Sequence, residues 1–193
     1  MATATLERRA TLKDLEALPD PGGYELVGGE LVERNTSIDS IETSFNLGGV
    51  LWAYVRANRL GRCFSSELGI QLHPNDPTHT RRADVSFVAR ARAPRVEAGY
   101  LRIPPDLVVE SVSPNDTAED VLAKAREWLA HGVRMVWMIY PGAGQVQIYR
   151  PGERPRLLSG DDEITGEDVV PGFCTSIANF MPDHFEDDIA PEA

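Results

Sequence analysis

Cysteine, lysine and long apolar runs are scarce in this chain of 193 residues, and each scarcity excludes a class of protein. The two cysteines, Cys63 and Cys174, are too few for a disulfide scaffold, and we expect both to be free, buried thiols. No stretch approaches the ~20 apolar residues that cross a bilayer. The first ten residues lack the apolar core of a secretory signal, so we expect a cytoplasmic protein without a membrane partner.

An excess of positive charge is also missing. The formal net charge is −11 at pH 7, which by itself argues against a nucleic-acid partner. The distribution changes that interpretation, because residues 151–193 hold 11 acids and 2 bases, whereas residues 1–150 hold 19 acids and 17 bases. Six arginines fall within residues 81–102, a basic segment that either contacts DNA or is simply solvated. Four of them are our candidate DNA contacts: Arg81, Arg82, Arg90 and Arg92.

The apolar pattern predicts an α/β fold of the mixed α+β kind, with a central mixed sheet flanked by helices. Helices are expected at residues 12–18, 38–58 and 118–131, and strands at 24–27, 30–34, 62–66, 68–72, 83–88, 106–112, 134–140 and 145–149, with further short strands in 156–180. Residues 106–140 read as strand, helix and parallel strand. We expect residues 1–10 to be a flexible tail, 11–180 a single domain and 181–193 an acidic tail.

Two carboxylates occupy positions where a carboxylate is costly. Asp84 lies within the strand-like ADVSFV, and Glu110 follows three branched apolar residues in DLVVESV. An ionised acid in a central strand must be paired, hydrogen-bonded or bound to a cation. Oxygen ligands at the ends of adjacent strands suit Mg²⁺ or Mn²⁺. The two acids are therefore candidate metal ligands, and pairing with arginines is the alternative explanation.

A lysine strengthens the case for a site. The chain has 17 arginines but only two lysines, and Lys124 borders the apolar face of the helix expected at 118–131. Lysine is a compact point charge whose pKa moves readily in a low dielectric, whereas arginine stays charged. The alternative is a lysine that reaches solvent along the edge of that face. Two acids and a lysine together suggest metal-assisted phosphodiester hydrolysis, in which Lys124 positions or deprotonates the attacking water or stabilises developing charge.

Five segments together resemble the Uma2 family of restriction endonucleases, within the PD-(D/E)XK nuclease superfamily: YELVGGEL (24–31), RRADVSFV (81–88), PPDLVVESVSPND (104–116), the Lys124–Trp128 spacing and GVRMVWMIYP (132–141). The resemblance covers roughly residues 11–175. It implies a restriction-endonuclease-like fold and a divalent metal held by Asp84, Glu110 and the carbonyl of Ser111. It also implies Asp84, Glu110 and Lys124 as catalytic residues and DNA as the substrate.

The sequence departs from the family pattern at two places. The first acid follows Ala83 where the family often has proline, and the segment Asp39–Glu42 has no histidine where relatives often carry one. In the superfamily the lysine usually follows the second acid by two residues. That position is Val112 here, and the family's shifted position falls on Lys124. Glu25 and Glu42 are candidates for residues that contact and orient the metal ligands without binding the metal themselves.

Alternatives remain open from sequence. A catalytically inactive relative could keep the fold as a DNA-binding or protein-binding module, and a glycoside hydrolase could use Asp84 and Glu110 as its carboxylate pair without any metal. No phosphate-binding loop or dinucleotide fingerprint occurs, so we expect no nucleotide cofactor. A homodimer is a further expectation, because nucleases that cut both strands commonly use two copies of one site.

Overall fold

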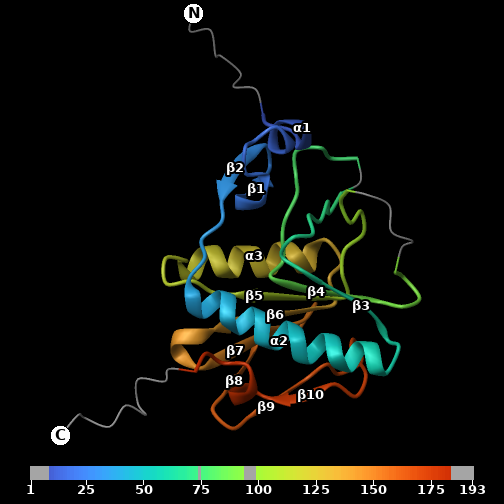
Figure 1. The fold of residues 1–193 in the computed structure, drawn as a ribbon, viewed down its shortest axis with the longest axis vertical. Helices are drawn as coiled ribbons and strands as arrows, with labels where there is room; N and C mark the ends of the chain where they lie inside the picture. Colours follow the sequence, from blue (N-terminus) through green and yellow to red (C-terminus); the bar gives the residue numbers. More distant parts are fainter. Residues whose placement is uncertain (1–8, 74, 94–98, 184–193) are drawn as a thin grey trace, which may run out of the picture.

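A six-stranded mixed sheet organises the computed structural model, which describes residues 9–73, 75–93 and 99–183 (Figure 1). The strands follow the order β3-β4-β5-β6-β7-β8: β3 (Gly61–Ser65), β4 (Val85–Ala89), β5 (Leu107–Ser111), β6 (Met135–Tyr140), β7 (Gln145–Tyr149) and β8 (Arg156–Ser159). Strands β5 and β6 are parallel, and the other neighbouring pairs are antiparallel. The predicted fold class is thereby confirmed.

Two helices cover the sheet, one on each face (Figure 1). Leu47 and Leu51 of α2 (Ile38–Ala57) pack in one core, and Trp128 of α3 (Ala118–Ala130) packs in the other. All five residues of β5 are buried; Leu107 and Val109 pack in the first core and Val108 in the second. A strand covered on both faces is usually apolar, so the buried Glu110 stands out in the sequence.

The hairpin of β1 (Tyr24–Val27) and β2 (Glu30–Glu33) lies above α3, next to α1 (Leu12–Glu16) (Figure 1). Its turn needs two left-handed residues, which Gly28 and Gly29 supply with φ of 58° and 88°. The backbone of Leu26 exchanges hydrogen bonds of 2.9 and 2.7 Å with that of Thr80. This contact holds the hairpin against the loop that leads into β4.

Helix α3 connects the two parallel strands and begins at a capped turn. The Thr117 hydroxyl accepts from the Asp120 amide at 3.2 Å and donates to the Asp120 carboxylate at 2.6 Å. Glu119 and Asp120 in the first turn also suit the positive end of the helix dipole. The cap fixes where α3 starts and therefore which side chains face the sheet.

Two expectations are wrong. Residues 68–72 form no strand; Ile70 makes only isolated bridges, to Arg81 and Leu101. Both cysteines are free, but Cys174 is exposed and Cys63 is half-buried. Cys174 begins β10 (Cys174–Ser176), where the buried neighbour Thr175 takes the inward position and leaves Cys174 outside.

The remaining elements are short. Strand β10 pairs with β9 (Glu163–Thr165) beside the main sheet, and three 3₁₀ turns occur at η1 (Pro21–Gly23), η2 (Pro141–Ala143) and η3 (Ile177–Asn179). The expected tails 1–10 and 181–193 fall largely outside the described residues, so the domain limits stay a prediction. No helix in the described part of the chain is long and apolar enough to span a membrane.

Candidate metal-dependent active site

Strand register brings the two predicted acids together. Strands β4 and β5 pair with Val85 opposite Val109, and one residue further this register sets Asp84 beside Glu110 on the same face. The Asp84 carboxylate accepts a 2.8 Å hydrogen bond from the backbone amide of Ser111. Its other oxygen accepts one of 3.2 Å from Arg34, which follows β2. The two acids therefore share one end of the sheet.

Helix α3 supplies the third predicted group. The ammonium of Lys124 lies 2.9 Å from Oε2 of Glu110 and 3.9 Å from Oε2 of Glu25. Burial lowers the pKa of Lys124, but the charges of Glu110, Glu25 and Asp84 outweigh it and raise the pKa above its ordinary value. Lys124 is thus a permanent cation at neutral pH, which favours charge stabilisation and water positioning over proton abstraction.

Glu110 is the most perturbed acid of the cluster. Its Oε1 accepts a 2.8 Å hydrogen bond from the indole of Trp128, and its Oε2 faces Lys124. Burial, joined by the charges of Asp84 and Glu25, raises the pKa of Glu110 to about 7 against the attraction of Lys124. Burial likewise raises the pKa of Asp84, against the attraction of Lys124 and the Ser111 amide. For both acids, the nearby positive charges do not fully offset the cost of burying an ionised carboxylate.

Glu25 connects the hairpin to this cluster. Its Oε1 accepts from the backbone amide of Arg82 at 2.7 Å, and its Oε2 accepts from the guanidinium of Arg81 at 2.8 Å. Burial raises the pKa of Glu25, but Lys124 and Arg81 more than compensate and leave it below the ordinary value. Glu25 is therefore ionised, and its negative charge attracts the Lys124 ammonium from the hairpin.

A cavity of about 400 Å³ opens over these groups. It is lined by the cluster of Glu25, Asp84, Glu110, Ser111 and Lys124. Residues that follow the hairpin (Arg34, Asn35), that precede α3 (Asp116) and that lie in its first turn (Asp120) also line it. None of the described residues lining it is aromatic, so it offers no stacking platform for a sugar. This absence counts against the glycoside hydrolase alternative.

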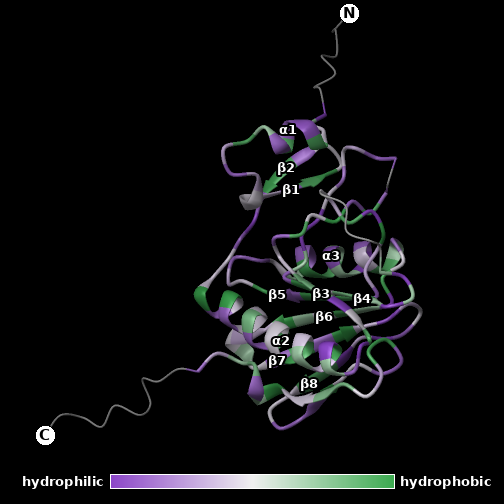
Figure 2. Ribbon diagram, turned by 45° about the vertical axis from the view of Figure 1, so that its right-hand side comes forward, coloured by the Kyte–Doolittle hydropathy of each residue, from purple (hydrophilic) through white to green (hydrophobic). Residues whose placement is uncertain are grey.

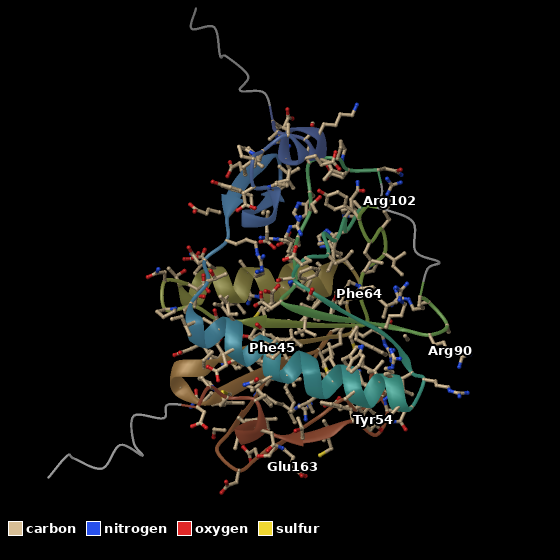
Figure 3. All side chains as sticks on the ribbon, viewed as in Figure 1. Phe45, Tyr54, Phe64, Arg90, Arg102 and Glu163 are labelled. Atoms are coloured by element: carbon tan, nitrogen blue, oxygen red, sulfur yellow. The ribbon has the colours of Figure 1, made fainter. Side chains whose placement is uncertain are left out.

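Three of the four arginines singled out from sequence are held by internal partners. Arg81 bridges Glu25 and Glu127, the guanidinium of Arg82 donates to the Glu67 carbonyl at 2.6 Å, and that of Arg92 donates to Asp106 at 2.7 Å. Arg90 is exposed and projects from the edge of the molecule, past the far end of β4 (Figure 3). The DNA-contact role of these residues stays a prediction. Arg81, Arg82 and Arg92 also connect segments within the fold through these contacts.

Glu42, the other supporting candidate, does not join the cluster. It is half-buried on α2 and is not among the residues that line the cavity. Two residues that were not among the predicted site residues do join the cluster. Arg34 donates a hydrogen bond to Asp84, and Trp128 donates one to Glu110. For Trp128 the signal was present, because it lies four residues after Lys124 and so on the same helix face. For Arg34 no signal existed, since its contact with Asp84 spans fifty residues.

A pH-dependent cluster of ion pairs joins α3 to the loop that precedes β4. Burial raises the pKa of Glu127, but hydrogen bonds from His79 and Arg81 and their charges lower it to about 2. A depressed carboxylate pKa stabilises the fold above the unfolded value of 4.5, and this stabilisation disappears as pH falls towards 2. Glu127→Gln should therefore lower the free energy of unfolding at pH 7 by roughly 2–3 kcal/mol.

Urea denaturation of wild type and Glu127→Gln between pH 7 and pH 2.5 measures this difference, which should shrink below pH 4.5. Glu30→Gln, an exposed acid on β2, serves as the control and should change stability little. A difference between wild type and Glu127→Gln that is constant over this pH range would contradict the assignment.

The mixed sheet with one helix on each face, and two acids beside a lysine at one end, define an α+β protein with a candidate active site. A family profile described as "Uma2: Putative restriction endonuclease" matches residues 11–178, so the chain belongs to the Uma2 family.

A solved structure supports the fold independently. The crystal structure of a "putative nuclease belonging to DUF820" from Anabaena variabilis ATCC 29413 superposes with a TM-score of 0.75 at 23% identity, covering 89% of this chain and 97% of that chain. No curated protein sequence matches the chain.

Proposed function

We propose that this protein is a metal-dependent endonuclease that hydrolyses DNA phosphodiester bonds. One observation carries the proposal: the half-buried carboxylate of Asp84 and the buried carboxylate of Glu110, both with raised pKa values, line one cavity together with the ammonium of Lys124. Membership of the Uma2 family supports a nucleic-acid substrate. The fold alone would not, because one fold hosts many activities.

The residues present fit a divalent metal. Carboxylate and carbonyl oxygens are the donors that Mg²⁺ and Mn²⁺ prefer, and Asp84, Glu110 and the carbonyl of Ser111 provide them. A raised carboxylate pKa marks a place where added positive charge is favourable. No group of three His, Cys, Asp or Glu side chains suited to a metal occurs among the described residues, so the proposed site has only two side-chain ligands. When bound, the metal supplies an activated water and neutralises phosphate charge.

The protein groups around the cavity have separate tasks in this proposal. Asp84 is held in place by the Ser111 amide and Arg34, and Glu110 by the Trp128 indole, so the ligand oxygens are preorganised. Lys124 stays protonated, donates a hydrogen bond to the attacking water or to a phosphate oxygen, and stabilises the negative charge that develops there. Glu25 keeps Lys124 charged and oriented.

Plasmid cleavage in Mg²⁺ or Mn²⁺ tests the assignment through Asp84→Asn. This change preserves size but removes one ligand charge, so the cleavage rate should fall by about 10²–10³-fold. Glu163→Gln, an exposed acid of β9 at the opposite end of the molecule from the hairpin (Figure 3), is the matched control and should cleave like wild type. Wild-type protein that neither binds divalent ions by calorimetry nor cleaves DNA would instead identify a non-catalytic relative.

A further inference from the structure

The outer face of α2 carries an apolar stripe that nothing in the described chain covers. Four large side chains form this outer α2 stripe: Ile38 (82% exposed), Ile41 (57%), Phe45 (79%) and Trp52 (50%). Their spacing of three, four and seven residues puts them on one side of the helix, opposite the buried Leu47 and Leu51. Hydrophobic segments recur along this helix in Figure 2, and Phe45 is marked on it in Figure 3.

The clustering of these residues on one helix distinguishes the stripe from scattered surface hydrophobics. Single exposed apolar residues are normal, but a contiguous patch of several hundred Å² on a soluble chain marks a contact site. Four of the seven large exposed hydrophobics in the described chain lie on this one helix. Ile38 and Ile41 have no ring to stack on a nucleic-acid base, so a protein surface suits the whole stripe better than DNA does.

Two glycines at the centre of α2 add a second observation. Glycine disfavours a helix interior, and Gly48 has an internal reason for it, since a Cβ there would lie 3.2 Å from Val85. Gly49 has none: it is exposed, and a Cβ there would meet nothing within 4 Å. It falls on the same side as Phe45 and Trp52, where a missing side chain lets another helix approach closely.

The stripe has the symmetry that a second copy requires. A two-fold axis between Gly48 and Gly49, with the helices antiparallel, sets Phe45 against the partner's Trp52, since the two residues lie equally far from the axis. The same axis sets Glu42 one residue out of level with the partner's Arg56, a gap that two long side chains can bridge, so opposite charges meet at both ends of the contact. One surface that is complementary to itself is the signature of a two-fold interface.

We propose that α2 is a homodimer interface, in which the outer α2 stripes of two copies pack antiparallel across Gly49. The occupant is a second copy of this chain, held by the apolar stripe and by Glu42–Arg56 pairs between subunits. The interface lies on α2, across the sheet from α3, and the groove beside the stripe also reaches Asp84. The proposal does not depend on nuclease activity.

Light scattering after size exclusion, in EDTA and without DNA, tests the oligomeric state of the full chain. Wild type should have twice the chain mass of 21.2 kDa at about 100 µM protein. Phe45→Asp, at a highly exposed position, should keep its circular dichroism spectrum and weaken dimerisation by at least ~100-fold. Glu42→Arg and Arg56→Glu should each weaken it, and the double variant should recover most of the loss.

A cysteine at the axis tests the register. In a Cys174→Ser background, Gly49→Cys should form a disulfide with its own copy under mild oxidation, because the two Cα atoms would lie within about 7 Å. Gly142→Cys is the control and should stay reduced, since Gly142 is likewise an exposed glycine where a Cβ would meet nothing within 4 Å.

Three results would overturn the interface. They are a monomeric wild type at about 100 µM, a dimer that Phe45→Asp leaves intact, and a monomer whose DNA binding is lost in Phe45→Asp, which would make the stripe a nucleic-acid surface. Because mass is measured without metal or DNA, an inactive protein can still support the dimer, and a monomer leaves the nuclease proposal standing.

Discussion

Replacing Glu110 by glutamine is expected to reduce DNA cleavage by about 10³-fold, the largest effect of any single change in this protein. Glutamine can still accept the hydrogen bond that Trp128 donates to Oε1, so the packing beneath the site is preserved. What is lost is the negative charge next to Lys124 and Asp84, which a divalent ion needs. Cleavage rates on plasmid DNA and calorimetric titration with Mn²⁺ measure both consequences.

The two measurements should change together in Glu110→Gln. Loss of cleavage with unchanged Mn²⁺ affinity would remove Glu110 from the ligand set and leave it a different role. Glu163→Gln is again the control, because it removes the same charge at an exposed position of β9 that does not line the cavity. A melting temperature close to that of wild type would show that the loss is not one of folding.

Replacing Lys124 by methionine is expected to lower the cleavage rate by about 10²–10³-fold while Mn²⁺ still binds. Methionine keeps much of the length of the side chain but removes the ammonium, which is 2.9 Å from Glu110. Without that cation, Glu110 and Asp84 lose the attraction that opposes the burial-driven rise of their pKa values. The pH at which activity reaches half of its maximum should therefore move upwards in the variant.

Lys124→Arg separates charge from geometry. Arginine restores the positive charge but presents a planar fork in place of a point donor, so we expect only partial recovery of the rate. Lys13, the other lysine of the chain, lies on α1 and does not line the cavity, which makes Lys13→Met the matched control. A Lys124→Met protein that cleaves DNA at the wild-type rate would exclude Lys124 from the chemistry.

Local patterns were sufficient to predict most of the fold. The Gly28-Gly29 turn, the capped start of α3 at Thr117 and the apolar run of β5 each have a local physical cause, and each element formed where it was expected. The segment 68–72 has strand-like composition, but only Ile70 forms bridges to other residues. A five-residue pattern cannot predict whether a neighbouring strand is available for pairing.

The candidate site was predictable to the extent that its residues are anomalous in their surroundings. Asp84 and Glu110 stand out because acids are rare in buried strands, and Lys124 stands out in a chain with 17 arginines and only two lysines. The partners of arginines are not predictable in this way, because long side chains find acids across the fold. Arg81 reaches Glu25 and Glu127, and Arg34 reaches Asp84, through contacts that only the packed hairpin creates.

A crystal structure with Mn²⁺ bound tests the central claim most directly. We predict an anomalous difference peak at the floor of the cavity, roughly 2.0–2.3 Å from carboxylate oxygens of both Asp84 and Glu110 and from the carbonyl of Ser111. A saturated crystal without a peak between the two acids, or with its manganese elsewhere, would contradict the proposed metal site and the hydrolytic mechanism built on it.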